Sequence, residues 1–287
     1  MTVITRFAPS PTGDLHLGHA YAAWYAWDVA MRAGGRFLVR IEDIDSGRCR
    51  AEFIDRNLDD LRWLGLTWEE PVVRQSERMD RYRDALQRLH DLGVTYPCFC
   101  TRREIRAEIE EAAGASHGMA PDGAILYPGI CRAWGVTERE NLIAAGRPYA
   151  VRLNAGRARE ATGDLSWTDR FLARQTAAPD RFGDVVIARK EVETSYHLAV
   201  VVDDAAQGVT EVTRGKDLFD ATHVHRVLYA LLDLPAPVWR HHDLCRDESG
   251  NRLAKRRGDE TIRSLRERGH TKDEVLAMAK AAVPRPA

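Results

Sequence analysis

The amino-acid sequence predicts an α/β fold built on a parallel sheet, and two observations carry that prediction. Residues 2–7 are typical of a short strand, residues 17–32 of a buried helix that a glycine pair ends, and residues 36–41 of a second strand. A strand, a helix and a strand within about 40 residues form a βαβ unit, which begins a parallel sheet. Acidic residues at 42–45 directly follow the second strand, where open α/β sheets place their ligands.

The remaining elements follow in chain order. Periodicity predicts helices at residues 52–66 and 76–93 and is lost from residue 96 to about 181, which indicates an insertion. Beyond it the strand–helix rhythm resumes with a strand at 184–189, a strand at 209–213 and a helix at about 218–232. We then expect a hairpin at 238–253 and two helices, the last opening with the capping box Thr271-x-x-Glu274. The predicted organisation is a nucleotide-binding domain split between 1–95 and 183–238, an insertion at 96–182 and a C-terminal region at 239–287.

Composition excludes several classes of protein. The 287 residues are 44% hydrophobic and 30% charged, which excludes a disordered or low-complexity chain. The longest apolar stretch, residues 20–30, contains Asp28 and is too short to span a bilayer, and the N-terminus has no signal-peptide pattern, so we expect a cytoplasmic protein with no membrane partner. The net charge of −1 indicates no overall affinity for nucleic acid, although residues 240–287 hold 12 Lys and Arg against 8 Asp and Glu.

A phosphate-binding element is expected where the first strand's loop becomes a helix, at His16-Leu17-Gly18-His19. His16 and His19 are three residues apart and share a face at a helix N-terminus, where N–H groups and the helix dipole favour anions. Gly18 lets a nucleotide approach the backbone, because a Cβ there would block it. The alternatives are a metal-binding pair or two incidental polar residues. The position after a strand and a proline-rich loop favours contact with a triphosphate.

The basic run from Arg252 to Gly258 is a second candidate for phosphate chemistry. A glycine-flanked cationic loop can close over a triphosphate and stabilise charge that develops on leaving pyrophosphate. Lys255 would supply a compact, flexible positive charge in that loop. If the run stood alone, a solvated basic turn would be the better interpretation.

Three of the five cysteines form a candidate metal site in the insertion. Cys98-x-Cys100 and Cys131 offer three thiolates, and a structural Zn²⁺ takes four ligands. His117 and Tyr127 are nearby candidates for the fourth, and general ligand preferences favour His117. The alternative is buried cysteines without a metal. The odd number and uneven spacing of the cysteines indicate no disulfide framework.

The two phosphate elements, in this order, resemble those of class I aminoacyl-tRNA synthetases. Further blocks narrow the resemblance to the glutamyl-tRNA synthetase family: Arg6-Phe7-Ala8-Pro9-Ser10-Pro11-Thr12-Gly13-x-Leu15-His16-Leu17-Gly18-His19, Ile41-Glu42-Asp43-x-Asp45, Tyr196-His197-Leu198-Ala199-x-Val201-Val202-Asp203-Asp204 and Arg214-Gly215-x-Asp217-Leu218. The resemblance is close over residues 3–45 and 184–258 and looser in the insertion. It implies a Rossmann-like parallel sheet of the class I synthetase type, with a zinc-bearing insertion and a short helical C-terminal region. It also implies ATP-dependent activation of glutamate, with Mg²⁺ bridging the phosphates.

The resemblance assigns roles to individual residues. Glutamate needs cations or donors for two carboxylates and an acceptor for its ammonium group, and side chains of these kinds stand at the matching positions. The implied glutamate contacts are Arg6, Ala8, Ser10, Glu42, Tyr196 and Arg214. The implied ATP contacts are His16, Gly18, His19 and Lys255, of which His16, His19 and Lys255 are the catalytic residues. The α-carboxylate would attack the α-phosphate, with no side-chain nucleophile. The alternative is that Arg6 and Arg214 are plain surface arginines.

Within this family the chain resembles a shortened branch, the glutamyl-queuosine tRNA(Asp) synthetases. That branch carries Cys-x-Cys…Tyr-x-x-x-Cys as its zinc set, which implies Cys98, Cys100, Tyr127 and Cys131 as ligands here. Only 32 residues follow Lys255, so we expect no helical anticodon-binding domain of the kind that a glutamyl-tRNA synthetase has. The implied function is transfer of activated glutamate to the queuosine base in the anticodon loop of tRNA(Asp), by a monomer.

Three other functions stay open on the sequence. They are a minimal glutamyl-tRNA synthetase that charges the 3′ end of tRNA(Glu), a small-molecule adenylyltransferase and an inactive RNA-binding relative. An adenylyltransferase shares the His-x-Gly-His element but not the glutamate set, and the intact His16, His19 and Lys255 argue against an inactive protein. The family pattern Lys-x-Ser-Lys is changed at Arg252 and Ala254 but kept at Lys255, so we expect activation to survive with altered loop contacts.

Overall fold

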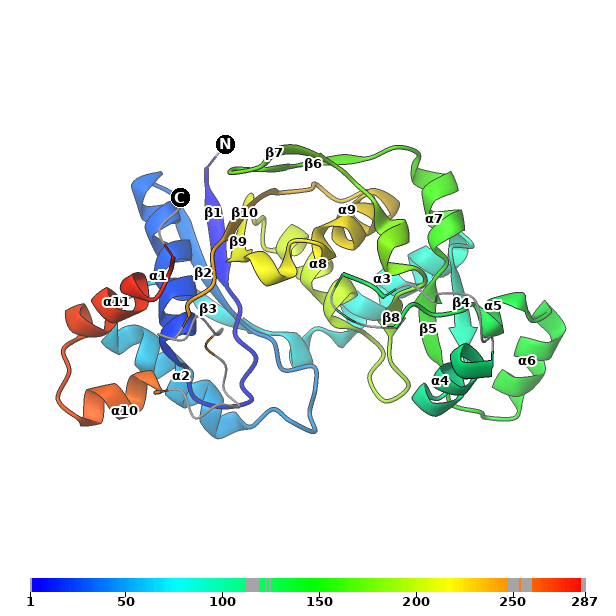
Figure 1. Cartoon of the computed structure of the whole chain (residues 1–287), viewed down its shortest axis with the longest axis horizontal. Coiled ribbons are helices and arrows are strands. Elements are labelled where there is room, and N and C mark those ends of the chain that lie inside the picture. The colour runs from blue at the N-terminus through cyan, green and yellow to red at the C-terminus, as the bar shows by residue number, and fades with distance from the viewer. Residues whose placement is uncertain are drawn as a thin grey trace.

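The computed structural model describes residues 2–111, 119–121, 123, 125–246, 253 and 260–284. Its N-terminal elements are β1 (Ile4–Phe7), α1 (Leu17–Arg32), β2 (Arg36–Ile41), α2 (Ala51–Trp63) and β3 (Glu69–Arg74), which Figure 1 shows at one end of the molecule. The three strands form one parallel sheet in the order β1-β2-β3. The strand, helix and strand expected within residues 2–41 are confirmed, and Gly34, with a φ of 61°, provides the left-handed turn that ends α1.

A second set of parallel strands lies beside the first. Its elements are α8 (Tyr196–Ala206), β9 (Glu211–Gly215), η3 (Lys216–Leu218), α9 (Ala221–Leu231) and β10 (Val238–His242), with β9 paired in parallel to β10. β1 packs beside β9, and the Thr210 N–H donates to the Ile4 carbonyl at 3.0 Å. The spatial order is therefore β3-β2-β1-β9-β10, and the strand order reverses between β1 and β9. The predicted Rossmann-like sheet is confirmed, and this reversal is where such sheets bind ligands.

A small antiparallel sheet combines two strands from the predicted insertion or its first boundary with a third strand that follows the insertion. Its strands are β4 (Thr95–Cys98), β5 (Ala150–Leu153) and β8 (Val186–Ala188), in the order β4-β5-β8. The helices between β3 and β6 along the chain are η1 (Gln75–Glu77), α3 (Met79–Asp91), α4 (Arg102–Glu111), α5 (Ile130–Ala133), α6 (Val136–Ala144) and α7 (Ala155–Thr162). The strand expected at residues 184–189 is present as β8, and it pairs antiparallel with β5 rather than joining the parallel sheet. A short apolar strand carries no local signal of its partner, since pairing is decided by long-range packing.

A hairpin inside the predicted insertion joins the parallel sheet instead. It consists of β6 (Ser166–Asp169) and β7 (Ala173–Thr176) and is followed by η2 (Pro179–Phe182). β6 pairs in parallel with β10, with Asp169 opposite Trp239. Figure 1 shows the hairpin running from α7 along the top of the molecule toward β1 and β10. The division of the chain at 96–182 remains a prediction, and sheet pairing crosses it.

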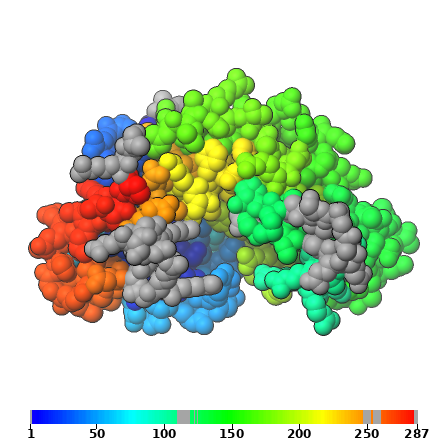
Figure 2. Space-filling model, viewed as in Figure 1, coloured from blue at the N-terminus to red at the C-terminus, as the bar shows by residue number. Residues whose placement is uncertain are grey.

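The C-terminal helices pack on α1. They are α10 (Ile262–Glu267) and α11 (Lys272–Ala281), and α11 opens with the expected capping box of Thr271 and Glu274. Val275 and Ala279 of α11 share a buried core with alanines of α1. Figure 2 shows these helices, in red and orange, at the end of the molecule opposite the green insertion. Helices expected at 52–66, 76–93 and 218–232 are likewise present with ends shifted by a few residues.

The hairpin expected at residues 238–253 can be compared with the structure only in part. β10 pairs in parallel with β9 and β6, so it is a strand of the main sheet. The returning half includes residues 247–252, which lie outside the described residues. At its end the Leu253 N–H donates to the Cys245 carbonyl at 3.1 Å, so the chain does return to the end of β10. Within the described ranges, no helix is long and apolar enough to cross a membrane.

Asp60 is a buried carboxyl in α2 whose replacement is expected to stabilise the protein. Its side chain is 0% exposed, and in the described part of the chain neither of its oxygens accepts a hydrogen bond. Burial raises the pKa of Asp60 to about 6. The folded protein therefore holds this proton more tightly than the unfolded chain, so stability falls as pH rises from about 4 to about 6. Asp60→Asn is expected to raise the free energy of unfolding at neutral pH by about 1–2 kcal/mol.

Urea denaturation at several pH values measures this effect. The free energy of unfolding of the wild-type protein should fall between about pH 4 and about pH 6, the pKa values of Asp60 in the unfolded and folded chain. That of Asp60→Asn should not change over this range. Arg263 lies 3.8 Å from the Asp60 carboxylate, and its attraction opposes the burial effect. Equal stability of the two proteins across that pH range would contradict the prediction.

Candidate active site and metal centre

A cavity of about 250 Å³ opens where β1 and β9 meet. Its walls come from β1, the start of α1, the end of β2, the start of α8 and the end of β9. The predicted site residues that line it are Arg6, Ala8, His16, Gly18, His19, Glu42, Tyr196 and Arg214. Segments far apart in the sequence therefore converge at the strand-order reversal, where an open α/β sheet binds its ligand. Ser10 is exposed and is not among the lining residues, and Lys255 lies outside the described residues.

His16 and His19 form the N-terminal cap of α1. The Gly18 N–H donates to His16 Nδ1 at 3.0 Å, and the His16 N–H donates to His19 Nδ1 at 3.2 Å. Because both Nδ1 atoms accept hydrogen bonds, each neutral ring carries its proton on Nε2 and can act as a donor there. A donor is what a phosphate oxygen requires. The two rings are in contact, with centroids 3.9 Å apart and planes tilted by 43°.

Gly18 has a second structural role besides the one expected from the sequence. A Cβ at this position would lie 2.9 Å from His16 Cε1 and 3.1 Å from His16 Nδ1. The His16 ring is held by its capping hydrogen bonds, so it cannot easily move aside. Glycine is therefore needed to keep the histidine in place as well as to leave the cavity wall open.

Arg6 is a buried arginine whose charge is already compensated. Its Nε and Nη2 donate to the two carboxylate oxygens of Asp204 at 2.9 and 3.2 Å, and its Nη1 donates to the Thr213 carbonyl at 3.2 Å. The fully buried Arg40 donates to the same carboxylate at 2.8 Å. Although burial by itself raises the pKa of Asp204, Arg6 and Arg40 hold it below its usual range. Asp204 thus stays ionised and fixes Arg6 at the cavity wall.

Arg214 is also buried, but its hydrogen-bond partners are neutral. Its Nε donates to His241 Nε2 at 3.1 Å and its Nη2 to Thr222 Oγ1 at 2.6 Å. Its Nη1 lies 3.3 Å from the Tyr196 hydroxyl and 3.2 Å from His225 Nδ1. Burial and the charge of Arg214 lower the pKa of both histidines, so they are uncharged. In the described part of the chain no carboxylate pairs with Arg214, so a substrate carboxylate would be its counter-ion.

Glu42 supplies the negative side of the cavity. Its side chain is 12% exposed and accepts a hydrogen bond of 3.3 Å from Arg40 Nη2. Burial raises the pKa of Glu42 despite that contact, so a further positive charge beside it is favourable. An uncompensated cation at Arg214 and this carboxylate on the same cavity wall match a small molecule that carries both an ammonium and a carboxylate.

Both described flanks of the basic loop reach this cavity. Cys245 and Leu253 line it, and Thr261 forms a β-bridge with His16. The Ile262 N–H also donates to the Leu15 carbonyl at 2.8 Å. The residues between these flanks, including Arg252, Ala254 and Lys255, lie outside the described residues, so the role of Lys255 stays a prediction.

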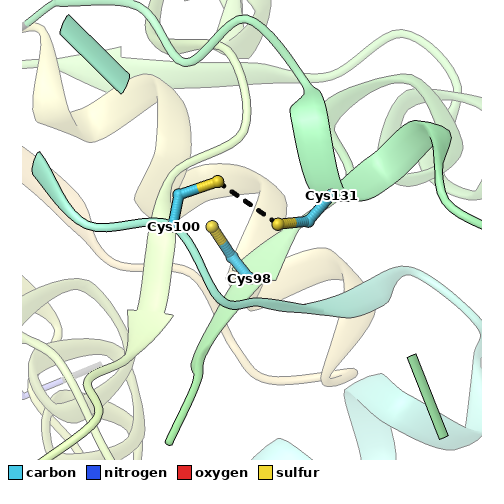
Figure 3. Close-up of side chains that lie close together, drawn as sticks. All are labelled: Cys98, Cys100 and Cys131. Atoms are coloured by element: carbon cyan, nitrogen blue, oxygen red, sulfur yellow. Dashed lines mark hydrogen bonds between the residues drawn. The ribbon is translucent and has the colours of Figure 1, made fainter. Parts of the chain in front are cut away.

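The three predicted cysteine ligands converge in the insertion. Figure 3 shows Cys98, from the end of β4, with Cys100 and with Cys131, from α5. Their sulfur atoms all lie within 4.8 Å of one another, with Cys100 and Cys131 3.3 Å apart. The Tyr127 hydroxyl is 3.5 Å from Cys100 Sγ and accepts the Cys131 N–H at 2.8 Å. Three sulfurs and a phenol oxygen at this separation fit a tetrahedral metal ion.

The surroundings of the cluster favour thiolates. The Phe99 N–H donates to Cys131 Sγ at 3.3 Å, and the Arg152 guanidinium lies 3.8 Å from the Tyr127 ring centroid. Hydrogen bonds from Cys131 and Tyr127 lower the pKa of Cys98, which favours the thiolate form that a metal ion binds. A buried thiolate cluster is the ligand set of structural zinc. His117, the other candidate for the fourth ligand, lies outside the described residues.

A second cavity, of about 1160 Å³, lies between the cysteine cluster and the first cavity. Cys100 and Tyr127 belong to its lining, as do Tyr196 and His197. Tyr196 also lines the first cavity, so the two meet at this residue. The basic side chains in the lining are Arg102, Arg106, Arg152, Arg189 and Lys190.

Several residues that organise the first cavity have no assigned role in the sequence interpretation. They are Arg40, Asp169, Asp204 and His241. Two of them leave a signal in the sequence: Arg40 interrupts the apolar run of β2, and Asp204 follows the apolar run of α8. A charged residue in a buried strand or helix needs a partner, and that requirement could have linked them. Asp169 and His241 leave no such signal, because their strands become neighbours only in the folded sheet.

Comparison with known proteins agrees with this geometry. The family model of the class I tRNA synthetases (E and Q), catalytic domain, matches residues 2–280. A glutamyl-Q tRNA(Asp) synthetase of Rhodobacter capsulatus is 50% identical over 95% of this chain and 98% of its own length, and a glutamate–tRNA ligase of Aquifex aeolicus is 38% identical over 96% and 56%. The crystal structure of a glutamate–tRNA synthetase from Elizabethkingia anophelis matches 94% of this chain with a TM-score of 0.76 and 26% identity.

The chain thus spans about half the length of the Aquifex ligase and of the crystallised synthetase, 56% and 54% respectively. It spans nearly the whole length of the glutamyl-Q relative. The class I family is defined by ATP-dependent amino-acid activation, so use of ATP is expected. The family match over residues 2–280 and the identities across nearly the whole chain show that it belongs to the class I tRNA synthetases of the glutamate and glutamine type, a family of ligases.

Proposed function

We propose that the protein activates glutamate with ATP in the absence of tRNA and transfers the glutamyl group to the queuosine base in the anticodon loop of tRNA(Asp). The observation that carries the proposal is the charge pattern of the first cavity. Arg214 has no carboxylate partner in the described chain, and the negative charge of Glu42 is only partly compensated by its neighbours. Similarity to relatives named glutamyl-Q tRNA(Asp) synthetase, at 41–50% identity, supports the choice of acceptor.

In the activation step an oxygen of the glutamate α-carboxylate attacks the α-phosphorus of ATP, and the bond to the bridging oxygen of pyrophosphate breaks. The products are glutamyl-adenylate and pyrophosphate, which leaves with the bonding pair. His16 and His19 present Nε2–H donors at the helix N-terminus, suited to the phosphate chain. Mg²⁺, when bound with ATP, would neutralise phosphate charge. Catalysis is then chiefly positioning and charge stabilisation.

In the transfer step a hydroxyl of the queuosine cyclopentene-diol attacks the glutamyl carbonyl carbon. The mixed anhydride breaks, AMP leaves with its oxygen, and the hydroxyl proton is released. The acceptor must reach the adenylate, and the second cavity meets the first at Tyr196. We place the anticodon loop in that second cavity, with phosphate contacts from its basic lining and from the C-terminal stretch.

We also assign Zn²⁺ to Cys98, Cys100, Cys131 and Tyr127. When bound, the ion would cross-link β4 to α5 and hold one wall of the second cavity. The three thiols contribute ligands whose pKa values fall on metal binding, and the Tyr127 oxygen is held by the Cys131 N–H. None of these residues contacts ATP or glutamate in the proposal.

A minimal glutamate–tRNA ligase is the competing function, because two ligases of that name are each 38% identical to this chain. Two measurements separate the functions. The first is glutamate-dependent pyrophosphate exchange without RNA, which we expect to be active. The second is transfer of labelled glutamate to tRNA(Asp) with and without queuosine, and to an unmodified tRNA(Glu) transcript. Label that requires queuosine and stays in the anticodon-loop fragment after nuclease digestion supports the proposal. Label at the 3′ end of the unmodified tRNA(Glu) transcript, which prior periodate oxidation of that transcript abolishes, overturns it.

Lys255→Ala is expected to lower pyrophosphate exchange by at least about 100-fold while changing the dissociation constant of glutamate by less than threefold. A positive charge at Lys255 would act on charge that develops in the transition state rather than on the bound amino acid. Exchange kinetics and glutamate calorimetry measure the two effects. Equal losses in both would contradict the role assigned to Lys255.

Arg102 and Arg106 lie one turn apart on α4, line the second cavity and form no ion pair in the described part of the chain. Arg106→Glu is expected to lower kcat/KM for tRNA about tenfold or more and to reduce the salt dependence of tRNA binding by about one ion, with exchange unchanged. Arg81→Glu, an exposed site on α3 with the same charge change, is the control. Equal effects of the two substitutions would remove the second cavity as the RNA site.

A further inference from the structure

The glutamate-facing cation Arg214 is held by a chain of hydrogen bonds that begins in the β6–β7 hairpin. His241 Nε2 accepts the Arg214 Nε–H at 3.1 Å, and His241 Nδ1 lies 2.7 Å from Asp169 Oδ2. Both the Asp169 and the His241 side chains are 0% exposed. We propose that Asp169 and His241 are positioning residues that fix the guanidinium of Arg214 for a substrate carboxylate by locking the His241 imidazole in its Nδ1–H form. This inference rests on the proposed glutamate site.

The orientation of Asp169 is set on both of its oxygens. Oδ1 accepts the N–H groups of Phe171 and Leu172 at 2.8 and 3.1 Å, which closes the tip of the hairpin. Oδ2 accepts the His241 backbone N–H at 3.2 Å as well as the ring contact. Although burial by itself raises the pKa of Asp169, these hydrogen bonds hold it below its usual range. The side chain is therefore an ionised acceptor in a fixed place.

The tautomer of His241 follows from its two neighbours. A carboxylate can only accept a hydrogen bond, so Nδ1 must carry the proton. Arginine can only donate, so Nε2 must carry the lone pair. A doubly protonated ring would place a donor against the Arg214 Nε–H, and burial together with the charge of Arg214 lowers the pKa of His241 to about 3. A single neutral form thus satisfies both contacts.

The lock matters because His241 is the partner of Arg214 Nε, whereas Thr222 Oγ1, the Tyr196 hydroxyl and His225 Nδ1 contact only the two Nη groups. Thr222 Oγ1 is a rotatable hydroxyl, and it lies 3.3 Å from His241 Nε2, so it competes for the same acceptor. The Tyr196 hydroxyl is likewise a rotatable partner, at 3.3 Å. The contact at Nε determines which edge of the Arg214 guanidinium is turned toward the cavity. Bidentate binding of a carboxylate depends on that orientation.

The same contacts connect two parts of the chain. Asp169 lies opposite Trp239 where β6 pairs with β10, and His241 follows on β10. A hairpin that falls within the predicted insertion thereby reaches a residue of the amino-acid pocket. The competing explanation is that the Asp169–His241 contact only ties the hairpin to the sheet. That explanation predicts loss of stability without any specific loss of glutamate affinity.

A pair of substitutions at His241 separates the two explanations. Phenylalanine fills the ring volume but has no acceptor for Arg214, whereas glutamine can place its amide oxygen near the position of Nε2. We expect His241→Phe and Asp169→Ala to raise the glutamate dissociation constant and KM at least tenfold, with KM for ATP changed less than twofold. His241→Gln should stay within threefold of wild type for glutamate. Arg174→Ala, an exposed hairpin residue bonded to Ser166, is the matched control and should behave as wild type.

The measurements are glutamate calorimetry, exchange kinetics and nitrogen-detected NMR of the His241 ring in the wild-type protein. NMR should show a neutral ring protonated at Nδ1, and an Nε2–H ring would overturn the proposal even if a variant failed to fold. Unchanged glutamate affinity in folded His241→Phe, or equal losses in the Phe and Gln variants, would also overturn it while leaving the proposed function intact. A wild-type protein that neither binds nor activates glutamate would instead refute the proposed function, and this inference with it.

Discussion

Arg214→Met is expected to reduce glutamate-dependent pyrophosphate exchange by at least about 100-fold without lowering the stability of the protein. Hydrogen bonds to charged groups contribute about 1.5–3 kcal/mol each, and a bidentate carboxylate contact would lose two of them. The stability side of the prediction follows from the partners of Arg214, which are uncharged. Removing a buried cation that lacks a counter-ion relieves a desolvation cost. Thr222, 3.3 Å from His241 Nε2, can donate to that nitrogen in place of Arg214.

Arg6→Met is the matched control, because Arg6 is an equally buried arginine on the wall of the same cavity. Its substitution leaves the ionised Asp204 with Arg40 as its remaining cationic partner, so the free energy of unfolding is expected to fall by about 2 kcal/mol or more. Both variants should lose activation, whereas only Arg6→Met should lose stability. Exchange kinetics and urea denaturation measure the two quantities. If Arg214→Met lowered the free energy of unfolding as much as Arg6→Met, Arg214 would have a counter-ion in the protein without substrate, contrary to the prediction.

The fold was predictable where a local pattern decides it. The βαβ unit at residues 2–41, the helices α2 and α9 and the capping box at Thr271 are all confirmed, because periodicity and cap residues act within a few positions. The partners of β6 and β8 were not predictable. Each is a short strand whose place depends on packing against segments tens of residues away, and β8 joins β5 although it directly precedes the return to the parallel sheet.

The identities of the site residues were also predictable, whereas their charge balance was not. The first cavity collects Arg6, Glu42 and Arg214 as expected. That Arg6 is compensated and Arg214 is not depends on Asp204, which lies on α8 between them in the chain and contacts only the first. Sequence alone treats the two arginines as equivalent, since compensation is a property of the assembled site. The structure therefore distinguishes the two arginines, which the resemblance to the synthetase family could not do.

Loss of the proposed zinc ion is expected to separate the two proposed half-reactions. Cys98, Cys131 and Tyr127 form the small core that joins β4 to α5, together with Phe99 and Tyr96. Structural zinc contributes about 10 kcal/mol or more to the folding of small zinc modules, so Cys131→Ser should lower the melting temperature and release the bound ion. The glutamate cavity is made from other elements, so exchange should stay within about threefold while transfer to tRNA falls at least tenfold. Metal analysis, thermal denaturation and the two activity assays test this expectation.

Tyr127→Phe tests the fourth ligand without disturbing the packing. The phenyl ring can keep its place beneath the Arg152 guanidinium, 3.8 Å from the ring centroid, while the oxygen that lies 3.5 Å from Cys100 Sγ is removed. Loss of one of four ligands is expected to weaken zinc binding at least tenfold, measured by competition with a chelator. His117→Ala is the matched variant at the competing position and should bind zinc as tightly as wild type. The opposite result, zinc retained by Tyr127→Phe and lost by His117→Ala, would move the fourth ligand to the histidine, because the tyrosine oxygen would then be only a partner of the Cys131 N–H.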